Sequence, residues 1–425
     1  MPEEIKYVII VGDGMADYPV EGLKGKTPLM VAKTPYMDWM AKHGEVGLVR
    51  TIPDGFNPGS EIANLSIFGY NPICYFTGRG PLEAASLGVK LQPNDIAFRC
   101  NLITLIFSDN KIIMDDFSAG HITDNEARAI LSDLDREMRT NDIRFYPGVS
   151  YRHLMVMKDG ASKFSNLEKL ELTPPHDILG KEITPFLPKI DEASGPKNSR
   201  GGGVKQILKL MTGSQRILKD HPVNLARKRK GLSPANSLWL WGQGRSPQMM
   251  TLKERFGIEG YVISAVHLLK GIGILAGLEV LEVPGATGYF DTNYDGKAQY
   301  ALRGLKEKNF VYVHVEAPDE AGHMGDLRLK IEAIEAFDEK IVGAILKGMN
   351  VFNRYKVMVL PDHFTPLSVR THTADPVPYV IYCNEEREKG GCAEAFDEVS
   401  ARQSGIFIKK GFGLIERFLN PHCSV

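Results

Sequence analysis

The chain is poor in cysteine and has no long apolar run. Its 425 residues include five cysteines, and no two of them form a C-x-x-C pair. An odd number of scattered cysteines in a long chain argues against a disulfide framework and indicates reduced thiols. No apolar run approaches the ~20 residues that a transmembrane helix needs. The first residues also lack the basic and apolar regions of a signal peptide, so we expect a cytoplasmic protein without a membrane partner.

The chain also lacks a charge imbalance. It has 51 Lys and Arg against 52 Asp and Glu, which gives a formal net charge of −1. This balance argues against a nucleic-acid partner, and we expect the basic run at residues 227–230 to be a solvated surface. A hydrophobic content of 43% and a charged content of 24% are typical of a globular protein. The length predicts two or three domains.

Both ends of the chain alternate between strand-like and helix-like segments. Such alternation predicts an α/β domain with a mostly parallel sheet. The predicted strands are residues 7–11, 47–52, 309–315 and 355–360, and the predicted helices are residues 36–43, 62–68 and 327–346.

The middle of the chain has a different sequence pattern. It contains a strand-like run at residues 97–103, a charged helical segment around residues 125–140 and a stretch rich in Pro, Gly and Lys at residues 172–205. The simplest architecture joins the two ends into one domain and inserts the middle into it. We therefore predict that residues 1–75 and 273–425 form the first domain and that residues 76–272 form an inserted second domain.

Aspartate and histidine side chains gather beside the strand-like runs. Asp362 and His363 follow the run at residues 355–360, where a turn would let both face one site. Asp319 and His323 are four apart at the start of a helix-like segment, so they share a face. Carboxylates with imidazoles bind divalent ions of the Zn or Mn class, and strand ends are where open α/β sheets build sites. The candidate ligands are Asp13, Asp319, His323, Asp362, His363 and His372. Because six exceed what one ion needs, we predict two metal ions.

A serine stands at a predicted strand–turn–helix junction. Ser60 follows Pro58 and Gly59 and precedes the helical segment at residues 62–68. By itself such a serine is usually a helix N-cap. Next to a cation its hydroxyl could ionise and become a nucleophile, which is the alternative that the metal ligands favour.

Candidate binders of an anionic small molecule lie in the middle block and just beyond it. Arg and Lys bind carboxylate and phosphate oxygens through charged hydrogen bonds. Each of these residues, taken alone, could equally be a surface side chain. They are Arg79, His121, Arg152, Arg245 and Lys297.

Several motifs occur in one order along essentially the whole chain. They are residues 12–17 (GDGMAD), 25–28 (GKTP), 33–35 (KTP), 58–61 (PGSE), 75–83 (YFTGRGPLE), 291–294 (DTNY), 314–323 (HVEAPDEAGH) and 361–363 (PDH). With these motifs the chain resembles the cofactor-independent phosphoglycerate mutases, in particular their archaeal-type branch, within the alkaline phosphatase superfamily. The resemblance implies an alkaline phosphatase-like, mostly parallel sheet flanked by helices, with a second α/β domain inserted.

The resemblance also implies how the ligands are shared. One ion would be held by Asp319, His323 and His372. The other would be held by Asp13, Asp362, His363 and the hydroxyl of Ser60. Mn²⁺ is the favoured ion, and Zn²⁺, Co²⁺ and Mg²⁺ are also compatible with these ligands.

The activity implied is the interconversion of 3-phosphoglycerate and 2-phosphoglycerate in glycolysis and gluconeogenesis, without 2,3-bisphosphoglycerate. Ser60 would accept the phosphoryl group as phosphoserine, and the inserted domain would act as a substrate-binding lid. The residues matched to substrate binding are His121, Arg152, Arg245 and Lys297.

Two alternative functions use the same metal centre but transfer the phosphoryl group to a different acceptor. The segments at residues 118–121 (SAGH) and 239–244 (WLWGQG) resemble a bacterial subgroup proposed to phosphorylate homoserine. Transfer to another alcohol, as in a homoserine kinase-like enzyme, and hydrolysis by a metal-dependent phosphomonoesterase therefore stay open. A phospho-ligand binding module without catalysis is a further alternative, which the intact Ser60 and ligand set disfavour.

Overall fold

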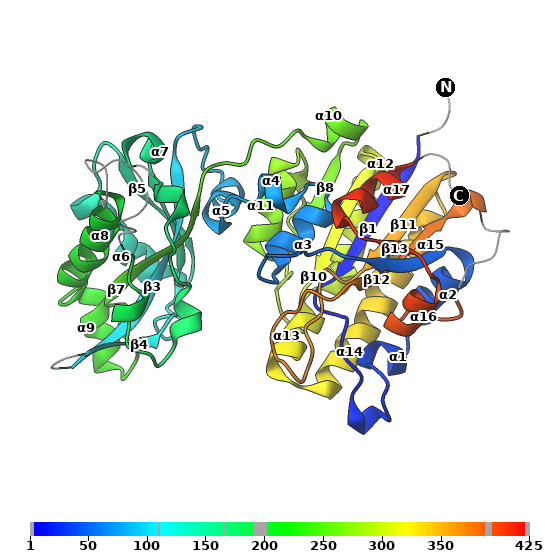
Figure 1. Cartoon of the computed structure of the whole chain (residues 1–425), viewed down its shortest axis with the longest axis horizontal. Helices are drawn as coiled ribbons and strands as arrows, with labels where there is room; N and C mark the ends of the chain where they lie inside the picture. The colour runs from blue at the N-terminus through cyan, green and yellow to red at the C-terminus, as the bar shows by residue number, and fades with distance from the viewer. Residues whose placement is uncertain (1–3, 109–110, 165, 190–201, 387–392, 421–425) are drawn as a thin grey trace. The chain divides into compact units, whose positions relative to one another are not determined.

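The computed structural model describes residues 4–108, 111–164, 166–189, 202–386 and 393–420. The chain divides into two compact units. Unit 1 consists of Met1–Phe76 and Gln248–Val425, and unit 2 consists of Thr77–Pro247. Figure 1 shows that strands from the two ends of the chain lie side by side in unit 1.

The boundary predicted at residue 272 is too far along the chain. Strand β8 (Gly260–Ile263) pairs in parallel with β10 (Phe310–Val315), so it belongs to the sheet of unit 1. Helix α10 (Leu252–Phe256) precedes β8 and also lies in unit 1. A strand of only four residues between helices gives too short an apolar run to be assigned to either domain from sequence.

Unit 1 is built on an eight-stranded sheet with the order β13-β2-β12-β11-β1-β10-β8-β9. Strand β1 (Lys6–Gly12) lies between β10 and β11 (Tyr355–Leu360) and is parallel to both. Among the described strands only β12 (Val377–Cys383) runs the other way, since it pairs antiparallel with both of its neighbours. The predicted α/β class with a mostly parallel sheet is confirmed. The remaining strands are β2 (Glu45–Val49), β9 (Glu279–Val280) and β13 (Phe407–Ile408).

Helices cover both faces of this sheet (Figure 1). Val8 and Ile10 of β1 pack into a core with α2, α12 and α14. On the opposite face the ring of Tyr312 stacks on Phe68 after α3, with centroids 4.2 Å apart. The helices are α1 (Pro28–Val31), α2 (Pro35–His43), α3 (Ser60–Ile67), α4 (Pro72–Tyr75), α11 (His267–Leu275), α12 (Tyr294–Glu307), α13 (Ala317–Met324), α14 (Leu327–Phe337), α15 (Ala344–Met349), α16 (Glu398–Gln403) and α17 (Leu414–Leu419).

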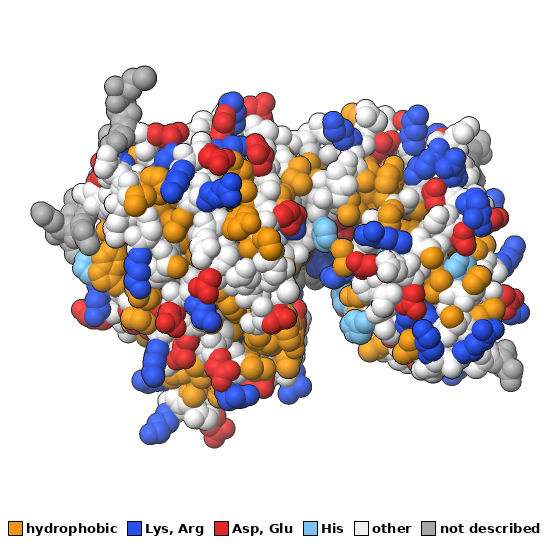
Figure 2. Space-filling model, turned by 180° about the vertical axis from the view of Figure 1, so that it is seen from behind, with side chains coloured by type: hydrophobic (Ala, Val, Ile, Leu, Met, Phe, Trp, Pro, Cys, Tyr) orange, Lys and Arg blue, Asp and Glu red, His pale blue; other side chains and the backbone are white. Residues whose placement is uncertain are grey.

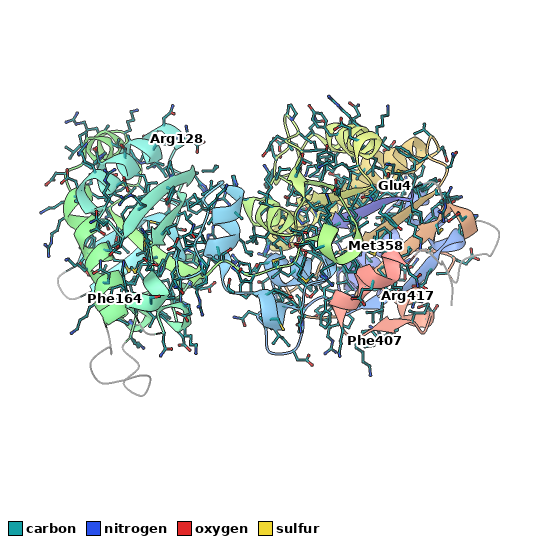
Figure 3. The ribbon with its side chains drawn as sticks, turned by 90° about the horizontal axis from the view of Figure 1, so that it is seen from above. Glu4, Arg128, Phe164, Met358, Phe407 and Arg417 are labelled. Carbon is teal, nitrogen blue, oxygen red and sulfur yellow. The ribbon has the colours of Figure 1, made fainter. Side chains whose placement is uncertain are left out.

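The helix predicted at residues 327–346 is divided. A π-helical turn at Asp338–Gly343 separates α14 from α15. At the rim of the sheet, Arg417 of α17 donates its Nε to Glu45 of β2 at 2.6 Å. Figure 3 labels Arg417 and also Met358, which lies within β11.

Unit 2 has a five-stranded antiparallel sheet, with β4, β3, β6 and β5 in that order and β7 paired to β3. One face of this sheet packs on α6 and α8 through a second, separate apolar core. The strands are β3 (Ile96–Ser108), β4 (Lys111–Asp116), β5 (Ile143–Val149), β6 (Arg152–Met157) and β7 (Ser237–Gly244). The helices are α5 (Arg79–Ser86), α6 (Asp124–Met138), α7 (Gly160–Lys163), α8 (Gly202–Leu218) and α9 (Pro222–Arg229).

The surface agrees with the balanced composition. Figure 2 shows Lys and Arg side chains interspersed with Asp and Glu on the visible face. The basic run at residues 227–230 is not wholly solvated as predicted, because Arg227 is buried and ion-paired with Glu126 at 2.7 Å. Within the described ranges, no helix has both the length and the apolarity to cross a membrane.

Candidate metal centre

The predicted ligands meet at the carboxyl edge of the large sheet. Asp13 directly follows β1, and Asp362 and His363 follow β11 beside it. Asp319 and His323 lie on α13, which begins just after β10 on the other side of β1. Because parallel neighbours end at one edge, three segments distant in sequence deliver their polar side chains to one place.

The first cluster combines α13 with the loop after β11. Asp319, His363 and His372 each offer a ligand atom within 4.8 Å of the others. The Nε2 atom of His323 lies 3.2 Å from Asp319 Oδ2 and 2.9 Å from His372 Nε2. All the residues expected to hold one ion are therefore close together, and His363 joins them.

The second cluster lies between β1 and β11. Asp13, Asp362 and His363 form a group of the same kind, and all three are buried. His363 Nε2 is 3.4 Å from Asp13 Oδ1 and 3.5 Å from Asp362 Oδ2. His363 thus belongs to both clusters, which a division of the ligands into two separate sets did not anticipate.

Ser60 faces the same histidine. It is the first residue of α3, and its Oγ lies 3.1 Å from His363 Nε2. Asn64, one turn further along α3, donates Nδ2 to both the Ser60 carbonyl and Asp362 Oδ2, each at 2.9 Å. The amide therefore ties the nucleophile candidate to a ligand of the second cluster.

Hydrogen bonds orient two of the imidazoles. His323 Nδ1 lies 3.0 Å from the carbonyl oxygen of Arg370, so it donates there and directs the Nε2 side of the ring toward Asp319. The Thr365 hydroxyl donates to Asp319 and lies 3.2 Å from His363 Nδ1. Because the Thr365 proton is donated to Asp319, His363 must donate its Nδ1 proton to the Thr365 oxygen. The Nε2 atom of His363 then has a free lone pair that faces Ser60.

The buried carboxylates have strongly shifted pKa values. Burial, together with the charges of Asp362 and Asp319, raises the pKa of Asp13 well above its usual value. Burial would also raise the pKa of Asp319, but hydrogen bonds from His323 and His372 hold it well below the usual value. The contact with Asp319 raises the pKa of His323 to about 9.

A glycine allows the loops to approach this closely. Gly14 has a φ of +60°, and a Cβ there would lie 2.5 Å from both Asp319 Oδ1 and Thr365 Oγ1. Its backbone N–H also donates to Asp362 Oδ1 at 3.1 Å. The second glycine of the GDG motif, Gly14, is therefore required by both the backbone conformation and the packing against the cluster.

The residues present fit divalent cations. Asp13 Oδ1 is buried and accepts no hydrogen bond within the described part of the chain. A buried carboxylate oxygen without a partner is costly, and a cation is the group that offsets three neighbouring carboxylates. Carboxylate, imidazole and hydroxyl donors are the set that Mn²⁺ and Zn²⁺ accept.

Two of the predicted substrate-binding residues lie together in unit 2. The Arg152 guanidinium lies 5.3 Å from the centre of the Tyr151 ring, and the His121 ring lies 6.3 Å from it. Arg99, which was not predicted, lies 4.4 Å from the Trp241 ring. Burial lowers the pKa of Arg99, and the neighbouring charges of Arg79 and Arg152 lower it further. These contacts define a cationic and aromatic cluster.

The other two candidates are placed differently. Arg245 of unit 2 forms an ion pair with Glu168 at 3.3 Å. Lys297 lies in unit 1 and is fully buried, and its ammonium donates to the His314 carbonyl at 2.8 Å. The lysine is enclosed in the interior of unit 1, and its contact with substrate stays a prediction.

Comparison with known proteins agrees with this architecture. The family model for 2,3-bisphosphoglycerate-independent phosphoglycerate mutase matches residues 41–224. A protein of Methanosarcina acetivorans with that name is 50% identical over 97% of this chain and 98% of its own. A Geobacter sulfurreducens protein named as a probable member is 48% identical over 98% of this chain and 100% of its own.

Two solved structures share the whole fold. A protein from Pyrococcus horikoshii superposes with a TM-score of 0.78 at 27% identity, covering 100% of this chain and 99% of its own. The cofactor-independent phosphoglycerate mutase from Thermoplasma acidophilum superposes with a TM-score of 0.64 at 26% identity, covering 97% and 98%.

Fold and site together define a two-unit α/β protein with a metal-type donor cluster beside a serine. The identity to curated relatives over nearly the full length makes the family plain. The chain belongs to the family of 2,3-bisphosphoglycerate-independent phosphoglycerate mutases.

Proposed function

We propose that this protein is the enzyme that interconverts 3-phosphoglycerate and 2-phosphoglycerate through a phosphoserine at Ser60, in the cytoplasm and without 2,3-bisphosphoglycerate. The observation that carries the proposal is the position of Ser60 Oγ, 3.1 Å from a histidine shared by two Asp/His clusters. The relatives named as this mutase over nearly the full length support the choice of substrate.

In the proposed reaction, the Ser60 oxygen forms a bond to phosphorus while the bond between phosphorus and the 3-oxygen of the substrate breaks. The proton lost by the Ser60 hydroxyl is matched by the one that the 3-oxygen gains. Glycerate then turns, its 2-oxygen takes the phosphoryl group, and Ser60 regains a proton. No water is consumed, so a site that admitted water would release free phosphate instead.

Helix α3 places Ser60 for this role. Its first backbone N–H groups have no partner within the helix, and its dipole is positive at this end. Both features favour the negative charge that develops on the serine oxygen and on the phosphoryl group. The Asn64 bond to the Ser60 carbonyl fixes the first turn of the helix in place.

We propose two divalent ions, with Mn²⁺ as the favoured species. Asp319, His323 and His372 would hold one ion. Asp13, Asp362, His363 and the Ser60 hydroxyl would hold the other. When bound, such ions supply positive charge that offsets the charge on the entering and leaving oxygens.

Unit 2 supplies the remaining substrate contacts in this proposal and serves as a lid. Its cationic and aromatic cluster, with His121 and Arg152 around Tyr151, presents the donors that a carboxylate or phosphate requires. Arg99 is held over Trp241 and paired with Glu83 at 2.9 Å, so it is oriented before any ligand arrives.

The test is product formation by the full-length protein. Chelator-treated protein is reloaded with Mn²⁺, incubated with 3-phosphoglycerate, quenched with excess chelator to remove the paramagnetic ion, and examined by phosphorus NMR. We expect 2-phosphoglycerate. Free phosphate without it would contradict the mutase in favour of a phosphomonoesterase. Phosphohomoserine from ATP and homoserine, again without 2-phosphoglycerate, would favour the kinase-like alternative.

Two serine variants of the same helix sharpen this test. Ser60→Ala should lower kcat by at least about 10³-fold, because it removes the phosphoryl acceptor. Ser66→Ala is the matched control, since the Ser66 hydroxyl is buried in α3 and makes no hydrogen bond within the described residues. Near-normal activity of Ser60→Ala would disprove the assignment of the nucleophile.

A further inference from the structure

A buried polar network lies behind Asp13, on the side away from Ser60 and His363. Three neighbouring parallel strands form it where they end. β10 pairs with β1 on one side and with β8 on the other, so His314 lies beside Val11, and Ser264 follows the residue paired with Val313. His314 and Glu316 are two apart, so they project from the same side of the extended chain.

The side chains of this network contact one another in a continuous series. Lys297 Nζ lies 2.8 Å from the His314 carbonyl and 3.5 Å from Glu316 Oε2. Glu316 Oε1 lies 3.2 Å from His314 Nδ1 and accepts the Ser264 hydroxyl at 3.2 Å. The side chains of His314 and Lys297 are fully buried, and Glu316 is 4% exposed. Each buried charge therefore has an opposite charge beside it.

This series of contacts ends at one carboxylate oxygen of Asp13. His314 Nε2 lies 3.2 Å from Asp13 Oδ2 as an ion pair, although it forms no hydrogen bond within the described residues. The other oxygen, Oδ1, accepts no hydrogen bond within the described residues and lies 3.4 Å from His363 Nε2. One carboxylate oxygen of Asp13 therefore contacts His314, and the other faces the donor cluster.

We propose that His314 is a positioning residue for Asp13, and that Glu316, Lys297 and Ser264 fix the ring of His314. Outer partners that hold a ligand carboxylate determine its orientation and commonly change metal affinity by about 10–100-fold when they are lost. Among the described residues, the network contacts Asp13 and no other proposed ligand. We therefore expect it to affect the ion of the second cluster and not the ion held by Asp319, His323 and His372. This inference rests on the proposed role of Asp13 as a metal ligand.

The test is calorimetric titration of chelator-treated, full-length protein with Mn²⁺. His314→Gln removes the ring, and Glu316→Gln keeps the shape of its side chain while removing the charge that holds the ring. We expect each variant to weaken one of two Mn²⁺ binding events by about 10–100-fold and to leave the other unchanged. If His314→Gln does not fold, Glu316→Gln carries the test alone.

Asp338→Asn is the matched control, because it alters a buried carboxylate of unit 1 that bonds only α2 backbone in the described structure. It should bind Mn²⁺ as the wild type does. Wild-type affinity in a folded Glu316→Gln variant would overturn the inference, as would equal weakening of both binding events. Failure of the mutase proposal is separable, because a wild-type protein that binds two Mn²⁺ without forming 2-phosphoglycerate leaves this comparison intact.

Discussion

At the scale of single residues, Gly14 offers a test of how tightly the donor cluster is packed. An alanine Cβ at this position would lie 2.5 Å from Oδ1 of Asp319, a proposed metal ligand, so the carboxylate or the loop has to move. We expect Gly14→Ala to weaken Mn²⁺ binding by about tenfold or more in calorimetric titrations.

Gly25 provides the control for this variant. It has a φ of +79°, yet a Cβ there meets nothing within 4 Å. Gly25→Ala therefore shares the backbone strain, about 1 kcal/mol, without the collision. Equal Mn²⁺ affinities for the two variants would show that packing against Asp319 is unimportant.

Asp338 makes a pH-dependent contribution to stability. Its carboxylate accepts the backbone N–H groups of Tyr36 at 3.1 Å and Met37 at 2.8 Å, and burial raises its pKa to about 7. A raised pKa means that the folded state binds a proton more readily than the unfolded state. The free energy of unfolding therefore falls as pH rises from about 4 to about 7.

Urea unfolding of metal-free protein at pH 5 and pH 8 checks this prediction. Asp338→Asn cannot ionise, so the wild type should lose stability relative to the variant on going to pH 8, by on the order of 2 kcal/mol. A difference between wild type and variant that is the same at both pH values would contradict the proposed titration of Asp338.

Most of the donors were predictable from sequence because they follow an apolar run or lie on a short helix just after one. Asp13 directly follows β1, and Asp362 comes one residue after β11 ends, which the residue order alone shows. His314 was not predictable, since it lies within a strand-like run and looks like an interior residue. Its contact with Asp13 depends on β10 lying next to β1, and the order of strands in a sheet cannot be predicted from local sequence. The contact of Lys297 with Glu316 was not predictable for the same reason.

At the scale of secondary structure elements, Arg227 joins three segments of unit 2. From α9 it bonds Glu126 of α6 at 2.7 Å and the carbonyls of Ala119 and Ser233 at 2.7 and 2.8 Å. Glu126 also completes the capping box with Thr123 at the start of α6. The loop that carries His121 is thus anchored to two helices.

Arg227→Met should lower the free energy of unfolding by about 1–3 kcal/mol, because the carbonyl oxygens of Ala119 and Ser233 lose the hydrogen bonds of a buried guanidinium. It should also raise KM for 3-phosphoglycerate, since the loop bearing His121 loses its anchor. Arg229→Met is the control, as Arg229 belongs to the same helix and is exposed. Chemical unfolding and steady-state kinetics measure both effects, and equal behaviour of the two variants would contradict the anchoring role.

The elements also explain which boundaries were predictable. The long strands of unit 1 and helix α6 lie within a few residues of their predicted positions, because strong periodicity identifies them. The π-helical turn between α14 and α15 leaves no local signal in the apolar pattern. The short strand β8 also produces no recognisable apolar pattern, which is why the inserted domain was predicted to end too late.

At the scale of the whole molecule, every proposed metal ligand belongs to unit 1. Metal binding should therefore stabilise unit 1 by about 2.7 kcal/mol at an ion concentration 100 times Kd and leave unit 2 unaffected. Hydrogen exchange with and without Mn²⁺ tests this, with slower exchange expected in β1, β10, β11 and α13. Equal slowing in the β3–β7 pair would mean that the ions act on both units.

The central position of β1 has a consequence for synthesis of the chain. Both of its neighbours, β10 and β11, are encoded after the whole of unit 2, since β1 ends at Gly12 and β10 begins at Phe310. At ~5–20 residues per second, a ribosome needs roughly 15–60 s to make the first partner strand. Throughout that time an apolar strand with two open edges is exposed to other nascent chains. We expect the newborn polypeptide to depend on a chaperone that covers its first dozen residues until the last third has emerged.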